Sequence, residues 1–144
     1  MPVVHHSAIC TRDIDASLRF WRDGMGMAVT MDLSFEGDWP TLFDAPTTTL
    51  RSIFLGDPAS PDAGIVELVD LGPIDTGEPN AQPRTGFFLL SFMVDVEEVL
   101  ARLARIGVGG EPRRIAVHGV DMAVIVDPNG VRVELIEATS AKSP

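Results

Sequence analysis

Two matching segments, one in each half of the chain, place the strongest constraint on the fold. Residues 64–70 read GIVELVD and residues 130–137 read GVRVELIE. Each segment is rich in β-branched residues, which is typical of a strand, and each holds a glutamate followed by leucine, an apolar residue and an acid. The match predicts an internal duplication, in which one small module occurs twice.

The same order of expected elements precedes both segments. Asp13 and Asp95 are typical helix N-caps, and Glu98 three residues after Asp95 suggests a capping box. The order β-α-β-β-β is predicted twice, so we expect an α+β fold. The first module, residues 3–70, consists of strand 3–11, helix 14–24 and strands 27–35, 50–55 and 64–70. The second module, residues 87–137, consists of strand 87–94, helix 96–106 and strands 113–118, 121–127 and 131–137.

Composition limits the number of domains and the kinds of partner. A length of 144 residues fits a single domain, with residues 71–86 as a connector between modules and 138–144 as a flexible tail. The 21 acidic residues outnumber the 11 Lys and Arg, giving a net charge of −10. Such a surface repels phosphate, so we expect no nucleic-acid or membrane partner. With one cysteine and no signal peptide, the chain is expected in the cytoplasm.

The repeated glutamates, Glu67 and Glu134, are the main candidates for a functional site. Both stand between apolar neighbours in an expected strand. A buried carboxylate is costly unless a cation or a metal pairs with it, and its recurrence at matching positions favours a shared site. An arginine is the alternative partner, from a set of three: Arg51, Arg84 and Arg132.

Further motifs resemble a known superfamily. His6 is followed by Asp13 and by a Leu-x-Phe-Trp helix at residues 18–21, and residues 127–137 read DPNGVRVELIE. This arrangement resembles the vicinal-oxygen-chelate superfamily, which includes glyoxalases, bleomycin-resistance proteins and extradiol dioxygenases. The resemblance covers residues 4–137. It implies a single glyoxalase-like domain over residues 1–144, in which two βαβββ modules form an eight-stranded mixed half-barrel cleft flanked by helices.

The resemblance also implies a metal site. Members bind a divalent metal through one residue of the first and one of the last strand of each module, which here are His6, Glu67, Leu89 and Glu134. Imidazole and carboxylate suit Zn, Mn, Ni, Co or Fe, whereas leucine supplies no donor. Because Leu89 occupies the fourth ligand position, the alternative that the protein binds no metal stays open. Ser91, two residues further on, shares the face of Leu89. The two histidines of an extradiol dioxygenase are missing, so oxygenase chemistry is not expected.

Two functions follow from the resemblance. The first is a metal-dependent lyase, isomerase or epimerase that acts on a small oxygenated substrate through an enolate-type intermediate, with His6, Glu67 and Glu134 as metal ligands and one glutamate as base. The alternative is a metal-free protein of the bleomycin-resistance type that binds a drug or another hydrophobic ligand. In both cases the partner is a small molecule, and a homodimer is expected.

The remaining candidate residues have ordinary structural interpretations. His6 itself can be a core histidine bonded to a carbonyl group. Strand alternation places His5 on the opposite face, as a reserve ligand. Cys10 shares the face of His6 and is expected to be a buried thiol. Trp39 and Phe43, in the turn-rich stretch 36–49, are possible residues of a lid over a ligand.

Overall fold

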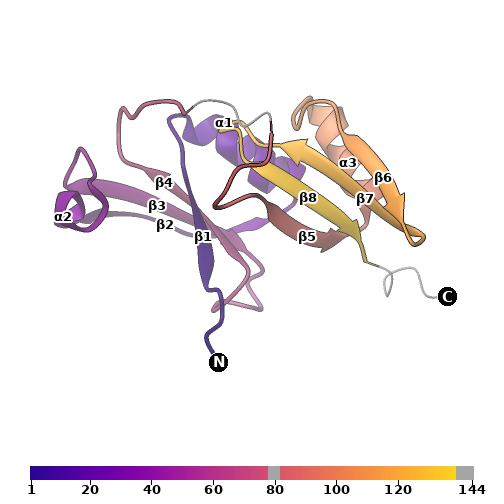
Figure 1. Ribbon diagram of the computed structural model, residues 1–144. Helices are drawn as coiled ribbons and strands as arrows, with labels where there is room; N and C mark the ends of the chain where they lie inside the picture. Colours follow the sequence, from indigo (N-terminus) through magenta and orange to yellow (C-terminus); the bar gives the residue numbers. More distant parts are fainter. Residues whose placement is uncertain (78–81, 139–144) are drawn as a thin grey trace. The chain divides into compact units, whose positions relative to one another are not determined.

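A computed structural model describes residues 1–77 and 82–138 (Figure 1). It divides into two compact units, Met1–Gly77 and Glu78–Pro144, and each is described by itself. The expected connector 71–86 includes residues 78–81, which lie outside the described residues. The same holds for residues 139–144 of the expected tail.

Each unit contains one four-stranded mixed sheet, and the two sheets have the same topology. The orders are β1-β4-β3-β2 and β5-β8-β7-β6. In each, the first strand runs parallel to the last and the other pairs are antiparallel. The predicted fold class and the duplication of the βαβββ module are confirmed. The strands are β1 (His6–Cys10), β2 (Ala28–Glu36), β3 (Thr49–Gly56), β4 (Ile65–Asp70), β5 (Leu90–Val94), β6 (Arg113–Val117), β7 (Val120–Val126) and β8 (Arg132–Glu137).

The helix of the first unit begins as predicted but changes its pitch. Asp13 caps α1 (Ile14–Leu18) by accepting a hydrogen bond from the backbone N–H of Ala16 at 3.0 Å. The helix continues as the π-helical segment η1 (Arg19–Gly24), where Met25 N–H reaches back five residues to Phe20 at 2.8 Å. A single helix was predicted over 14–24. The wider second part of the observed helix, η1, buries the side chains of Phe20 and Trp21 completely.

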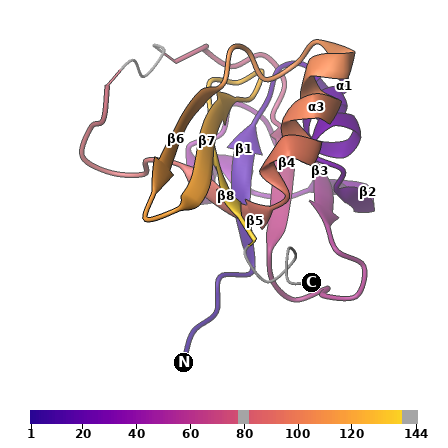
Figure 2. The same ribbon diagram turned by 90° about the vertical axis from the view of Figure 1, so that its right-hand side faces the viewer.

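The helix of the second unit, α3 (Val96–Ile106), has both of its predicted ends. Asp95 accepts a hydrogen bond from Glu98 N–H at 3.0 Å, and Gly107 ends the helix with φ 72°, a value that favours glycine. Figure 2 shows α3 beside the strands of its own sheet, and its contacts are with β7 and β8. No helix in the described part of the chain is long and apolar enough to cross a bilayer.

Helix α1 in the first unit and helix α3 in the second each cover one face of the sheet in their own unit. Because side chains alternate across a strand, the residues between the helix and the sheet form the core, and the other face is left for a site. The buried side chains of this core are Ile9, Phe20, Trp21, Ile53, Leu55, Val66 and Leu68 in the first unit, and Val96, Val99, Leu103, Ala123, Ile125, Val133 and Leu135 in the second.

A short helix, α2 (Trp39–Phe43), lies in the stretch that was expected to be a loop. Asp38 caps it by accepting from Thr41 N–H at 3.3 Å. The Trp39 indole donates to the carbonyl of Phe35 at 3.1 Å and stacks on Phe43. Trp39 also packs against buried Ala45, Leu50, Val69 and Leu71. Trp39 is thus held in a local core, while Phe43 is exposed.

Candidate functional site

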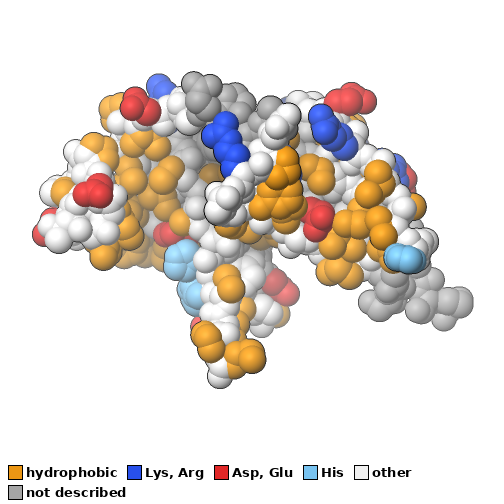
Figure 3. All heavy atoms as spheres, in the orientation of Figure 1, with side chains coloured by type: hydrophobic (Ala, Val, Ile, Leu, Met, Phe, Trp, Pro, Cys, Tyr) orange, Lys and Arg blue, Asp and Glu red, His pale blue; other side chains and the backbone are white. Residues whose placement is uncertain are grey.

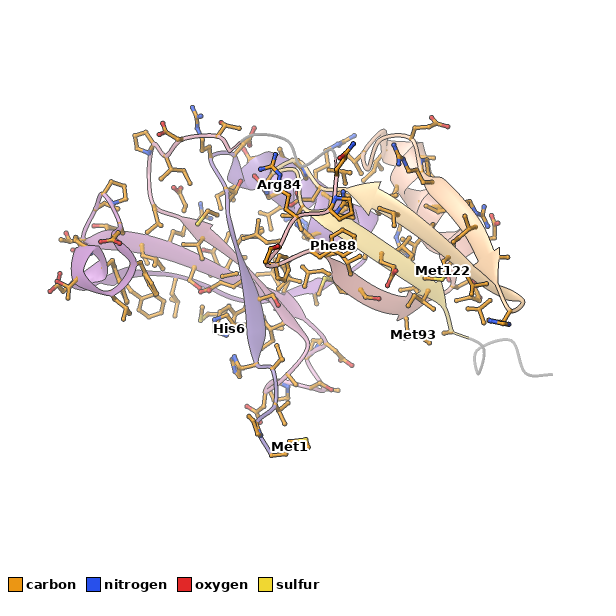
Figure 4. The ribbon with its side chains drawn as sticks, viewed as in Figure 1. Met1, His6, Arg84, Phe88, Met93 and Met122 are labelled. Carbon is orange, nitrogen blue, oxygen red and sulfur yellow. The ribbon has the colours of Figure 1, made fainter. Side chains whose placement is uncertain are left out.

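In the first unit, the face of the sheet opposite buried Leu68 brings together His6 and Glu67. In the sheet, Ala8 is the register partner of Glu67 on one side and Phe54 is its partner on the other. His6, two residues before Ala8, therefore lies on the same face. Its Nε2 atom is 3.4 Å from Oε1 of Glu67, with the side chains 39% and 14% exposed respectively. Figure 4 labels His6 on β1.

Hydrogen bonds extend from this pair on both sides. Ser52 Oγ donates to Oε2 of Glu67 at 2.5 Å, and Nδ1 of His6 lies 2.8 Å from Nδ1 of His5. Ser52 is only 2% exposed. The sequence reasoning missed Ser52, although a serine among the apolar residues of β3 was a signal that a buried polar partner existed nearby.

The spacing of His6 and Glu67 fits two ligands of one metal ion. Zinc lies about 2.0–2.1 Å from a histidine nitrogen and about 2.0–2.2 Å from a carboxylate oxygen, and tetrahedral geometry then separates the two donors by roughly 3.4 Å. The observed distance from Nε2 to Oε1 is 3.4 Å. Within residues 1–77 and 82–138, no three His, Cys, Asp or Glu side chains form a metal-binding group.

The arginine alternative is not supported for Arg51. Its guanidinium donates two hydrogen bonds to the carboxylate of Asp32, at 3.0 and 2.9 Å, on the face opposite Glu67. These bonds hold the pKa of Asp32 below its usual value. In the second unit, the guanidinium of Arg132 lies 4.6 Å from the ring centre of Phe88.

Glu134 occupies the position in the second unit that Glu67 occupies in the first. Ser91 is its register partner on β5, and Ser91 Oγ donates to Oε1 of Glu134 at 2.8 Å. Leu89 precedes Ser91 by two residues, as His6 precedes the partner of Glu67. Leu89 lies one residue before β5, at the position that corresponds in the second unit to His6 in the first.

The Glu134 face of the second sheet carries exposed apolar side chains. Met93 is 65% exposed and Ile115 is 64% exposed. The register puts both on this face, because Met93 pairs with Ile136 and Ile115 pairs with Met122. Figure 3 shows hydrophobic side chains over this sheet, and Figure 4 labels Met93 and Met122. Such a surface suits an apolar ligand or partner.

A pocket of the first unit is lined in part by Phe54, the register partner of Glu67 on β3. It has a volume of about 470 Å³, and its lining includes Val29, Phe54 and Ile65. The ring centre of Phe54 is 5.5 Å from that of His6. A slightly larger pocket is lined in part by Arg51, on the face that points away from Glu67. Phe54 is therefore the residue that the smaller pocket shares with the surroundings of His6 and Glu67.

Two expectations about neighbouring residues were wrong. Cys10 is exposed rather than buried, because its face of β1 is not covered by the helix. Partial burial of the thiol and the negative charge of Glu67 raise the pKa of Cys10, so Cys10 is a poor nucleophile.

His5 was expected on the face opposite His6. It lies before the first residue of β1, where strand alternation does not apply. Its ring lies beside His6 and Phe54.

Comparison with known proteins gives consistent matches. The profile of the Glyoxalase/Bleomycin resistance protein/Dioxygenase superfamily matches residues 3–135. The lactoylglutathione lyase-like protein terB of Aspergillus terreus is 36% identical over 147 aligned positions, which cover 92% of this chain and 74% of that protein. The lactoylglutathione lyase of Schizosaccharomyces pombe is 27% identical, and the match covers 96% of this chain but only 48% of that enzyme.

Solved structures share the fold. The trypanothione-dependent glyoxalase I of Leishmania major superposes with a TM-score of 0.69 at 22% identity, covering 98% of this chain and 90% of that one. A glyoxalase family protein of Enterococcus faecalis gives a TM-score of 0.66 at 23% identity, with coverages of 93% and 96%. At this level of identity, the likeness concerns the fold alone.

Proposed function

The chain belongs to the Glyoxalase/Bleomycin resistance protein/Dioxygenase superfamily, and we propose that it is a divalent-metal-dependent lyase, isomerase or epimerase. The proposed substrate is a small oxygenated molecule that reacts through an enolate-type intermediate. The observation that carries the proposal is the distance of 3.4 Å between His6 and Glu67, which matches the spacing of two ligands of one ion.

His6, Glu67 and Glu134 would hold the ion in this proposal. A neutral imidazole and two carboxylates suit Zn, Mn, Ni, Co or Fe, and water can complete the coordination at the place where Leu89 supplies no donor. When bound, such an ion stabilises negative charge that develops on a substrate oxygen. The carboxylates compensate the positive charge of the ion.

Glu134 is the better candidate for the base. Both oxygens of Glu67 already have partners, because Oε2 accepts from Ser52 and Oε1 faces His6. Glu134 accepts one hydrogen bond through Oε1, from Ser91. Its Oε2 atom has no hydrogen bond within the described residues, and it is the atom that would take a proton from the carbon next to a substrate carbonyl group.

Metal analysis tests the proposal directly. Protein purified without chelators should contain nearly one equivalent of a divalent transition metal by elemental analysis. His6→Asn and Glu134→Gln should each lose most of it, because each removes a donor while keeping a similar shape. The matched controls are His118→Asn and Glu111→Gln, which change exposed residues outside the candidate site. Metal retained in the two site variants, or absent from well-folded wild-type protein, would contradict the proposal.

Activity is tested first with the chemistry of the named relatives. Two relatives are a lactoylglutathione lyase and a lyase-like protein, so formation of lactoylglutathione is the first assay. Under the proposal, activity falls when the metal is removed and returns when it is restored. Glu134→Gln should lower kcat by at least about 100-fold, because it removes the general base as well as a metal donor. A panel of small hydroxy ketones extends the assay if lactoylglutathione is not formed.

The second candidate function is metal-free binding of a small hydrophobic ligand. The observations that favour it are Leu89 at the fourth ligand position and the exposed Met93 and Ile115 on the Glu134 face. Apolar dyes and drugs should then bind with affinities that a strong chelator does not change. Binding that disappears with the metal would favour the first proposal instead.

We also propose that the protein is a homodimer. The two sheets are open, with β1 and β2 at the edges of one and β5 and β6 at the edges of the other. Exposed strand edges and apolar faces are ordinary sites of self-association. Sedimentation equilibrium should give twice the chain mass of 15.5 kDa, and a mass that stays at one chain at high concentration would contradict this.

A further inference from the structure

Each of the two repeated glutamates accepts a hydrogen bond from one serine. Ser52 Oγ, on β3, donates to Oε2 of Glu67 at 2.5 Å. Ser91 Oγ, on β5, donates to Oε1 of Glu134 at 2.8 Å. An ionised carboxylate can only accept hydrogen bonds, so the serine hydroxyl is the donor in both contacts.

The two serines come from opposite sides of their glutamates. Ser91 is the register partner of Glu134 on the parallel neighbouring strand, where Glu67 has Ala8. The first module therefore lacks a hydroxyl at the position from which the second module supplies one.

On the antiparallel neighbouring strand, the first module has a serine and the second module does not. Ser52 pairs with Val69, two residues after Glu67, and Met122 pairs with Ile136, two residues after Glu134. Met122 thus occupies in the second module the position of Ser52 in the first. One hydroxyl per glutamate is kept in both modules although the position that supplies it differs, so the contact does not simply follow from the duplication.

We propose that Ser52 and Ser91 are positioning residues that fix the two carboxylates for binding of a divalent cation, an inference that rests on the proposed function. A glutamate side chain has several rotatable bonds, and ordering it on binding costs entropy. A serine that bonds to one oxygen orders the side chain beforehand and directs the other oxygen. For Glu67 that other oxygen is Oε1, which faces Nε2 of His6. Partners of metal ligands commonly act in this way.

The exposure of the two serines predicts which of them matters more for metal binding when its hydroxyl is removed. Ser52 is 2% exposed, so water cannot readily replace its hydroxyl when it is removed. Ser91 is exposed, and water can substitute there. Loss of the hydroxyl of Ser52 is therefore expected to matter more than loss of that of Ser91.

Zinc affinity measured in competition with a chromophoric chelator tests the proposal. Ser52→Ala should weaken Zn²⁺ binding about 10-fold at unchanged stoichiometry, the lower end of the usual effect of such a partner. Ser91→Ala should weaken it less. Ser34→Ala is the matched control, because it removes an exposed serine on the opposite face of the first sheet and should leave affinity unchanged. The thermal midpoint of each variant shows that it is folded.

A rescue variant separates positioning from simple packing. Ala8 is exposed on the face of Glu67, so Ala8→Ser in the Ser52→Ala background places a hydroxyl where Ser91 stands in the other module. In the double variant, zinc affinity should recover most of what Ser52→Ala lost.

Three outcomes decide the test. The inference is overturned if Ser52→Ala binds zinc as tightly as wild-type protein does. It is also overturned if the affinity of Ser52→Ala falls only in step with its thermal midpoint and Ala8→Ser restores no affinity. Wild-type protein that binds no Zn²⁺ overturns the proposed function itself, a distinct outcome. If Ser52→Ala does not fold, an unchanged affinity of Ser91→Ala overturns the inference.

Discussion

Nδ1 of His5 lies 2.8 Å from Nδ1 of His6, so one imidazole donates a hydrogen bond to the other. A neutral histidine carries a hydrogen on only one ring nitrogen. If Nδ1 of His6 is the donor, its Nε2 atom, which faces Glu67, has its lone pair available for a cation. His5 then supports His6 as the outer partners of metal-bound histidines usually do.

The first prediction concerns this support. His5→Ala should weaken Zn²⁺ binding about 10-fold, because His6 loses the acceptor that fixes its ring and its tautomer. Competition with a chelator measures the change. Val4→Ala, which shortens an exposed residue just before His5, is the control and should bind zinc as wild type does. Equal affinity of His5→Ala and Val4→Ala would show that the contact between the histidines is incidental.

The second prediction uses Cys10 to report the charge of Glu67. Partial burial and the Glu67 carboxylate raise the pKa of Cys10, so the thiolate fraction near neutral pH is below that of free cysteine. Iodoacetamide should alkylate Cys10 slowly at pH values below its pKa, and Glu67→Gln should make alkylation faster by removing the negative charge. Glu111→Gln, an exposed change elsewhere, should leave the rate unchanged. Mass spectrometry over time measures the rates, and equal rates in Glu67→Gln and wild type would refute the coupling.

The third prediction concerns stability and pH. Hydrogen bonds from Arg51 lower the pKa of Asp32 in the folded state, so the pair stabilises the fold above the unfolded pKa of about 3.9 and stops doing so as pH falls through the folded pKa. Both side chains are exposed to solvent, so Asp32→Asn should cost at most about 1 kcal/mol near neutral pH. Urea unfolding should show that this cost shrinks as the pH falls below the unfolded pKa of about 3.9. A cost that is independent of pH would contradict the ionic origin.

The sequence predicted the fold because local patterns and the repeat agreed. Asp13, Asp95 and Gly107 marked the helix ends, and the repeated strand fixed the order of elements in both modules. The π-helical turn at η1 could not be predicted, because its wider pitch follows from how Phe20 and Trp21 pack on the sheet. Helix α2 was missed because five residues are too few for a visible period.

The candidate site was predictable only where the resemblance to the superfamily supplied the residues. The resemblance implied that His6 and Glu67 share a site, and the structure brings them within 3.4 Å of each other. The contact between Ser52 and Glu67 runs diagonally across two strands, so it depends on the register of β3 against β4, which the sequence does not show. The exposure of Cys10 depends in turn on which face the helix covers.

The fourth prediction tests the assignment of Leu89 as the missing ligand. Leu89 stands two residues before the register partner of Glu134, as His6 stands two residues before that of Glu67. Leu89→His should therefore supply a further imidazole donor and raise zinc affinity by about 10-fold or more, since each tenfold gain needs only about 1.4 kcal/mol. Leu89→Ala is the matched control, because it removes the leucine without adding a donor and should not gain affinity. If both variants bind zinc as wild type does, the side chain at position 89 does not reach the ion, and the correspondence between the two modules does not extend to their metal ligands.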